Sequence, residues 1–271
     1  MAEPLVLLER DGPVAVVSFN RPEKLNAWAW GPTDALCEIA DELRFDDTVR
    51  VVVMRGNGRA FCAGEDLRPE TDDVEERHPG RSPAEQAHKS YEMARYCFDR
   101  WAVVDQLPQP VIAAIHGYCL GAGLELAMLA DIRIAATDAI FALPQTTLGV
   151  QVVGGADLRM VSEIGAARTK LLTMTGRRFG PVEAESWGLV QQVVEPDELV
   201  PTVMALAHEI AANAPLAVQG AKRAINFVAY DGFDRAARFE AMSQSILWSS
   251  QDLTKGFAAK AAKRQAEFEG Y

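Results

Sequence analysis

The sequence has few of the residues that build metal centres. Its 271 residues include four histidines and four cysteines, and the cysteines are widely spaced, at Cys37, Cys62, Cys97 and Cys119. None of them forms a C-x-x-C motif, so we expect no structural zinc site and no other metal. The sequence also lacks an apolar run of about 18 residues and a basic N-terminal segment followed by an apolar one. We therefore expect no membrane span, a cytoplasmic location and reduced thiols.

An excess of positive charge is missing as well. The formal net charge is −11 at pH 7, so binding to nucleic acid or to an anionic membrane has no support from the overall charge. Hydrophobic residues make up 49% of the chain, which is ample for a packed core. A length of 271 residues fits one domain, or one core with an appendage.

The chain is organised around residues 110–130, where two apolar segments flank a turn of small residues. Val111–Ile115 predicts a buried strand, and Leu124–Ala130, which is apolar on every side, predicts a buried helix. Between them, Gly121-Ala122-Gly123 allows a sharp turn and leaves the first N–H groups of the helix without partners. Glu125 places a carboxylate inside this helix, and burial requires a partner or a chemical role for it. A distant arginine could pair with it, but the adjacent donor-rich turn favours chemistry.

A second turn of small residues follows an earlier strand. Val49–Arg55 predicts that strand, and the segment A-F-C-A-G-E-D-L at residues 60–67 comes soon after it. Because two such turns each follow a core strand, their amides could point at a single oxygen atom. Residues 68–83 are polar, acidic and contain proline, which predicts a surface loop that serves either as a flap or as a plain linker.

The remaining pattern alternates strands and helices up to Val194 and is helical afterwards. We therefore predict an α/β core over residues 1–195 and a helical region over residues 196–271 that packs against a neighbouring subunit. Turn residues and hydrophobic spacing place further strands at Leu5–Glu9, Val14–Phe19, Asp131–Ala135, Ala139–Phe141 and Leu189–Val194. They place helices at Pro32–Leu43, Ala84–Leu107, Ala156–Glu163, Ala166–Thr173 and Pro181–Trp187, with a loop at Pro144–Gly155.

Taken in order, these motifs resemble the enoyl-CoA hydratase/isomerase (crotonase) family over nearly the whole chain. The resemblance lies in A-F-C-A-G-E-D-L at 60–67, H-G-Y-C-L-G-A-G-L-E-L-A at 116–127, D-I-R-I-A at 131–135 and F-A-L-P at 141–144. The two glycine turns together are far more specific than either one alone. The resemblance implies a crotonase-like α/β fold, a spiral of repeating ββα units, with a helical C-terminal region that forms homotrimers. Trimers of the family often pair into hexamers.

The resemblance also implies an acyl-CoA thioester as substrate and no cofactor beyond the coenzyme A that the substrate carries. Matching the motifs assigns the two backbone N–H groups of an oxyanion hole to Glu65 and Ala122. The carbonyl of Ala63 would lie beside the adenine amino group of CoA. Lys260 and Lys263 fall where the family meets the CoA phosphates, although a solvated basic helix face would also explain them.

One catalytic position departs from the family pattern. The hydratases of the family use two glutamates, and Glu125 matches the first, whereas the second is Gln145 in this chain. A glutamine side chain cannot exchange a proton near neutral pH and can only hydrogen-bond. The double-bond isomerases of the family mostly rely on the same position, so simple isomerisation loses support too. Downstream, residues 149–160 lack the Pro-Gly of the family and remodel the wall near the acyl group with apolar residues.

Three functions stay open at the level of the sequence. The first is hydration of a trans-2-enoyl-CoA to a 3-hydroxyacyl-CoA, with Glu125 as acid and base through a bound water that Gln145 holds. The second is another enolate-forming reaction on an acyl-CoA, such as isomerisation, decarboxylation or hydrolysis. Glu65 and Asp66 could then approach the pocket, although a cap of the turn is the favoured role for Asp66. The third is an acyl-CoA binder without catalysis. The buried Glu125 argues against the third, because a binder gains nothing from a buried carboxylate.

Overall fold

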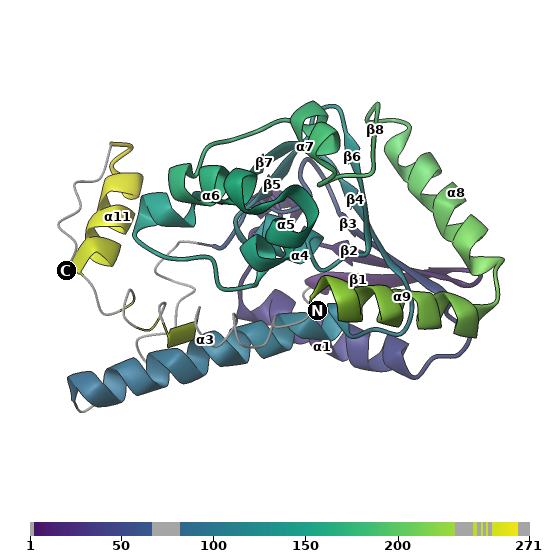
Figure 1. Ribbon diagram of the computed structural model, residues 1–271, viewed down its shortest axis with the longest axis horizontal. Coiled ribbons are helices and arrows are strands. Elements are labelled where there is room, and N and C mark those ends of the chain that lie inside the picture. The colour runs from purple at the N-terminus through teal and green to yellow at the C-terminus, as the bar shows by residue number, and fades with distance from the viewer. Residues whose placement is uncertain are drawn as a thin grey trace.

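A six-stranded sheet lies at the centre of the protein. The computed structural model describes residues 3–66, 82–230, 241–242, 245, 248 and 251–264. The strand order of the large sheet is β1-β2-β3-β4-β6-β8, and β5 and β7 form a second, two-stranded sheet (Figure 1). Only the β1–β2 pair is antiparallel among the described strands, and the other pairs are parallel. The strands are β1 (Val6–Asp11), β2 (Val14–Phe19), β3 (Val51–Gly56), β4 (Val111–Ile115), β5 (Tyr118–Leu120), β6 (Ile132–Ala136), β7 (Ile140–Ala142) and β8 (Gln192–Val194).

Both faces of the large sheet are covered by helices. On one face, Val52 and Met54 of β3 join the cluster that includes the apolar side of α1 (Trp30–Arg44). On the other face, Val51 and Val53 join the cluster that includes α8 (Leu199–Ala211). Burial on both faces explains why the central strands are unbroken apolar runs rather than alternating ones.

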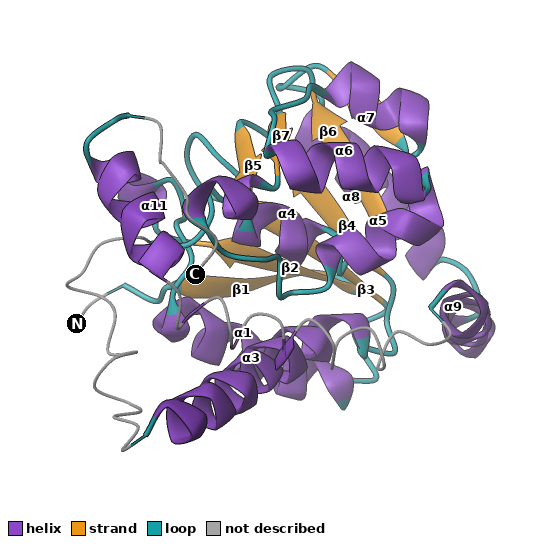
Figure 2. Ribbon diagram, turned by 60° about the vertical axis from the view of Figure 1, so that its left-hand side comes forward, coloured by secondary structure: helices purple, strands orange, loops and turns teal. Residues whose placement is uncertain are grey.

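The other helices surround this core. The long helix α3 packs along α1, and Figure 2 shows the two side by side next to the sheet. The described elements besides α1 and α8 are the 3-10 helices η1 (Pro22–Lys24) and η3 (Pro144–Leu148) and the helices α3 (Pro83–Asp105), α4 (Ala122–Ala127), α5 (Ala156–Ile164), α6 (Ala166–Thr175), α7 (Pro181–Trp187), α9 (Pro215–Ala229) and α11 (Gln251–Ala261).

The structure departs from the sequence prediction mainly around the central turn. Helix α4 spans Ala122–Ala127 rather than Leu124–Ala130, because Gly121, with φ of 50°, serves directly as its N-cap. Strand β5 was not predicted, since three residues between Gly117 and Gly121 are too few to show a period. The loop predicted over residues 144–155 contains the 3-10 helix η3, and β8 is shorter than the predicted strand.

Two further predictions concern the edges of the described chain. Residues 68–81 of the predicted loop lie outside the described residues, and Ser82 and Pro83 begin α3, where the Ser82 hydroxyl accepts a hydrogen bond from the Glu85 N–H. After β8, the described residues form helices and no strand. The boundary after residue 195 stays a prediction. Within the described ranges, none of the helices combines the length and apolar character needed to cross a membrane.

Candidate active site

The short strand β5 aligns three segments that are far apart in the sequence. Cys62 forms a bridge with Cys119 of β5, and β5 pairs with β7 as well. Because the three segments run parallel, the residues that follow them meet at one edge of this small sheet. A Cβ atom built on Gly121 would lie 3.9 Å from the Cα of Gly64 and 3.8 Å from the Cδ of Pro144. The two glycine turns and the start of η3 therefore adjoin one another.

The turn at residues 60–66 bonds to β5 through Cys62 and to Trp28 from Gly64 onward. At Gly64, where the partner changes, φ is +104°, a value that only glycine readily adopts. The Trp28 N–H donates to the Gly64 carbonyl at 2.7 Å, and the Asp66 N–H donates to the Trp28 carbonyl at 2.8 Å. Successive N–H groups of an extended segment point to opposite sides. The Glu65 N–H is therefore directed away from Trp28.

Ala122 is the first residue of α4, so its N–H group has no acceptor within the helix. Its φ is not left-handed, so an alanine adopts this backbone conformation without strain. The next residue does require glycine, because a Cβ on Gly123 would lie 2.2 Å from the carbonyl oxygen of Cys62. This close packing seats the start of α4 against the 60–66 turn.

Glu125 lies one turn into α4 and is 5% exposed. Its Oε1 accepts hydrogen bonds from Nε2 of Gln145 at 3.2 Å and from the N–H groups of Val153 and Gly154, both at 3.3 Å. Within the described ranges no arginine or lysine pairs with Glu125, and no hydrogen bond reaches Oε2. That second oxygen is therefore available to water or to a ligand.

Burial gives Glu125 an unusual pKa. Loss of hydration is the main cause, and it raises the pKa of the carboxyl group to about 7. The Gly154 N–H lowers this pKa, while the negative charge of Glu65 raises it further. A carboxyl group with this pKa exchanges protons readily near neutral pH.

Gln145 stands beside Glu125 at the start of η3. Its Nε2 donates to the carboxylate, while its Oε1 is buried without a hydrogen-bond partner. A buried acceptor of this kind is rare in a folded protein and is normally satisfied by water or a ligand. The structure thus brings Glu125, Gln145 and both turns together.

Helix α3 contributes two residues that were not predicted from the sequence. The ring of Trp101 packs closely on Gly154. A Cβ atom built on Gly154 would lie 2.6 Å from two carbons of that ring and 3.1 Å from the Cβ of Glu125. Cys97 lies one turn earlier, and burial, followed by the charges of Glu65 and Glu125, raises its pKa to about 12. The spacing of Cys97 and Trp101 on one helical face was the available signal.

The residues predicted to bind CoA lie toward the outside. Ala63 is half-buried, and its N–H donates to the Leu25 carbonyl at 3.0 Å. Lys260 is in the last turn of α11 and Lys263 follows it, and both are exposed. Helix α11 packs against η3, but no hydrogen bond or ion pair joins either lysine to Ala63 in the described part of the chain.

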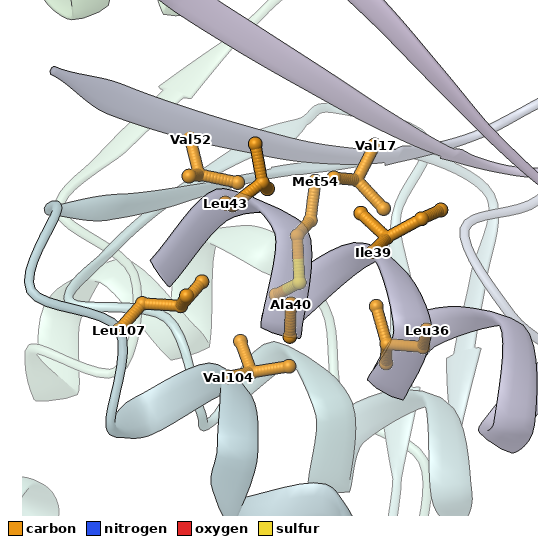
Figure 3. A pocket seen from close by; sticks show the side chains of 9 residues that line it. All are labelled: Val17, Leu36, Ile39, Ala40, Leu43, Val52, Met54, Val104 and Leu107. Carbon is orange, nitrogen blue, oxygen red and sulfur yellow. The ribbon is translucent and has the colours of Figure 1, made fainter. Parts of the chain in front are cut away.

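A small cavity elsewhere in the core is not a reaction site. It lies between the sheet, α1 and α3, and every residue that lines it is apolar (Figure 3). It contains no group that could bind or transfer a proton, so it is a packing defect. Across the described ranges, no cluster of three histidine, cysteine or acidic residues could hold a metal ion.

Comparison with known proteins identifies the family of the chain. The sequence model of the enoyl-CoA hydratase/isomerase family matches residues 9–271. The chain belongs to this family. Among similar proteins, the short-chain-enoyl-CoA hydratase of Clostridium acetobutylicum is 35% identical, over 97% of this chain and 96% of that protein. The 1,2-epoxyphenylacetyl-CoA isomerase of Escherichia coli is 32% identical, over 95% of each.

The structural comparison agrees with the sequence. An enoyl-CoA hydratase/isomerase from Pseudoalteromonas atlantica superposes with a TM-score of 0.84 at 26% identity, covering 98% of this chain and 100% of that one. The enoyl-CoA hydratase of Bacillus anthracis has a TM-score of 0.73 at 32% identity, covering 98% and 100%. The predicted crotonase-like α/β fold is confirmed, and this family member is an acyl-CoA enzyme.

Proposed function

We propose that the protein hydrates a trans-2-enoyl-CoA to a 3-hydroxyacyl-CoA, as a lyase of the EC 4.2.1 type. The observation that supports this proposal is the environment of the buried Glu125. Three donors fix its Oε1, whereas its Oε2 has no described partner. Two turns, the proposed source of amide donors, lie beside it. Its pKa of about 7 suits a group that must both accept and release a proton. Relatives such as the crotonyl-CoA hydratase of Syntrophomonas wolfei, 33% identical over 99% of each chain, support the same reaction.

The proposed oxyanion hole consists of the N–H groups of Glu65 and Ala122. As water bonds to C3, the electron pair of the double bond moves toward the thioester oxygen and an enolate forms. Donors fixed by the backbone stabilise that charge without reorganising, and losing one such donor costs about 3 kcal/mol. The contacts of Gly64, Gly121 and Gly123 support this assignment, since they hold the two turns against each other.

Glu125 performs both proton transfers in this proposal. Its Oε2 takes a proton from the attacking water as the water oxygen bonds to C3, and it then gives the proton to C2 of the enolate. Gln145 holds Oε1 through its Nε2, and the Oε1 atom of Gln145 accepts a hydrogen bond from the water. With a single carboxyl group, the reaction is slower than with two.

The proposal extends to the rest of the substrate and to assembly. The Ala63 carbonyl would bind the adenine amino group, Lys260 and Lys263 would bind the CoA phosphates, and no further cofactor is needed. The helical region over residues 196–271 would form a homotrimer or hexamer. Support comes from α9, where Leu216 is 80% exposed and Ile225 is 65% exposed, as at subunit interfaces.

A different enolate reaction is the second candidate. Gln145 removes the second acid of the hydratases, and one similar protein is named an isomerase of an epoxyacyl-CoA. Such a reaction would use the same oxyanion hole and the same Glu125 but would not add water to C3.

The experiment that tests the proposal incubates the protein with crotonyl-CoA in heavy water and analyses the products by mass spectrometry. We expect a water adduct for the natural protein and none for Glu125→Gln, with acyl-CoA binding retained. If deuterium enters C2 of butyryl-CoA and crotonyl-CoA gives no water adduct, the hydratase proposal is wrong and the site catalyses another enolate reaction. Adduct formation unchanged in Glu125→Gln would overturn the role of that residue.

The pH dependence tests the same role. Both directions of the reaction begin with Glu125 ionised, so we expect kcat/KM to rise with pH, with an apparent pKa of about 7, and to be lost below it. Initial rates with crotonyl-CoA between pH 5 and pH 9 would measure this profile. A profile that is flat through pH 7 would contradict the assignment.

A further inference from the structure

The loop before α1 and the turn at residues 60–66 form one hydrogen-bonded unit. The Ala63 N–H donates to the Leu25 carbonyl, and the Trp28 backbone bonds to the residues on both sides of Glu65. The direction of the Glu65 N–H therefore depends on residues 21–28, which lie far from it in the sequence.

This loop adopts an unusual backbone conformation. Leu25 and Asn26 have φ values of 53° and 55°, in the left-handed region that residues other than glycine rarely occupy. The Asn26 side chain donates to the carbonyls of Asn57 and Ala60 and accepts from the Arg21 N–H. Strain of this kind persists only where the surroundings determine the conformation. Specific side-chain bonds therefore hold the loop in place.

A buried ion pair joins the loop to the turn. The side chains of Arg21 and Asp66 are 10% and 5% exposed, and Nη2 lies 2.9 Å from Oδ2. The Nη1 atom of Arg21 donates to the Ala27 carbonyl, so one guanidinium group contacts both segments. Lys24 places its Nζ 3.8 Å from the same Asp66 oxygen. Asp66 directly follows Glu65 in the chain.

We propose that Arg21 and Asp66 are positioning residues whose ion pair directs the Glu65 N–H at the thioester oxygen. The inference rests on the proposed function, because it requires the oxyanion hole. A charge-assisted hydrogen bond in a buried site is strong and directional, so it holds the peptide between Gly64 and Glu65 against rotation. Asp66 acts through the Glu65 peptide and takes no part in proton transfer.

The test removes the charge of Asp66 while keeping its shape. For Asp66→Asn we expect kcat with crotonyl-CoA to fall by about tenfold or more and KM to stay within about threefold, because a donor used in the transition state is displaced. The matched control is Asp131→Asn. Asp131 pairs with Lys222 at 2.8 Å and accepts from the Val111 N–H at the start of β4, at the opposite end of that strand from the glycine turns. The control should leave kcat unchanged.

A spectroscopic measurement separates positioning from a merely structural role. A conjugated enoyl-CoA absorbs at longer wavelength when N–H donors polarise its carbonyl group, and the shift is measured per bound molecule. We expect Asp66→Asn to bind the probe with a smaller shift than the natural protein. We expect Arg21→Met/Asp66→Asn to recover the melting temperature lost in Asp66→Asn but not kcat, since neutralising both partners relieves the unpaired charge without restoring the link.

The outcomes distinguish a failure of the positioning role from a failure of the proposed function. If the natural protein binds the probe without any shift, the oxyanion hole and the proposed function fail together with the inference. If the natural protein shifts the band and Asp66→Asn gives the same shift and kcat, only the positioning role is overturned. Recovery of kcat together with melting temperature in the double variant would also overturn it.

Discussion

At the residue scale, Gln145 stands where the resemblance to the hydratases places a second glutamate. Its Nε2 lies 3.2 Å from Oε1 of Glu125. A glutamine side chain has the same length as the glutamate that the hydratases carry. Its amide can orient a water but cannot supply a proton. The other amide atom, Oε1 of Gln145, is buried without a hydrogen-bond partner in the described part of the chain.

We predict that Gln145→Glu gains hydratase activity. A second carboxyl group separates water activation from proton delivery, and such a group contributes about 10²-fold or more when well placed. We expect a rise in kcat with crotonyl-CoA of at least about tenfold, since the new side chain has not been tuned by its surroundings. The pH profile should also change from one rising limb to a bell, because two adjacent carboxyl groups share a proton.

The control for this variant is Gln145→Ala, which removes the hydrogen bond to Glu125 without adding an acid. It should be slower than the natural protein. Steady-state hydration rates of the three proteins between pH 5 and pH 9 would decide the matter. A Gln145→Glu variant no faster than Gln145→Ala would show that the site cannot use a second carboxyl group.

At the scale of elements, the C-terminal helix α11 is coupled to the site through η3. A Cβ atom on Gly256 would lie 2.3 Å from the carbonyl oxygen of Leu148 and 2.6 Å from its carbonyl carbon. These are backbone atoms that cannot rotate aside, so any side chain there must displace α11. Helix α11 carries Lys260, and η3 carries Gln145, so displacement affects both ends of the proposed substrate site.

We predict that Gly256→Ala raises KM for an acyl-CoA by about tenfold, the size expected for losing a charge-assisted contact. The matched control is Gly220→Ala in α9, where no described atom outside the helix's own backbone lies within 4 Å of the new Cβ. That change should leave KM unchanged and stabilise the protein by about 0.5–1 kcal/mol, because alanine favours a helix. Titration with acyl-CoA would measure both. An unchanged affinity in Gly256→Ala would show that α11 is not coupled to the site.

The elements also show what the sequence could and could not reveal. The strands at 14–19 and 111–115 have the predicted bounds, because unbroken apolar runs between turn residues carry a strong signal. Strand β5 carries no such signal, yet it aligns the two glycine turns with η3. Trp101 and the Arg21–Asp66 pair escaped prediction for the same reason: their roles come from tertiary contacts between distant segments.

At the scale of the whole molecule, the buried charge of Glu125 lowers the stability of the fold. Glu125 lies among fully buried apolar residues of α4, such as Leu124 and Leu126, and its charge is expensive there. The acidic balance of the chain, with 38 acidic and 27 basic residues, adds further repulsion. A residue kept at such a cost is expected where function needs it.

This cost gives a prediction for unfolding. The pKa of Glu125 rises from 4.5 in the unfolded chain to about 7 in the fold. Between these values the unfolded chain ionises first, so the natural protein loses stability as pH rises from 4.5 and the loss is complete above pH 7. Glu125→Gln has no such titration. Its stability advantage should be near zero at pH 4.5 and grow to about 3 kcal/mol above pH 7.

Urea unfolding of both proteins at several pH values between 4.5 and 8 would measure this difference. Glu23→Gln is the control, because it removes one negative charge from an exposed position and not from the buried site. A Glu125→Gln variant that is no more stable than the natural protein at pH 8 would show that the folded protein stabilises the carboxylate. In that event Glu125 would titrate near its ordinary pKa, and the rising limb of activity would move to more acidic pH together with it.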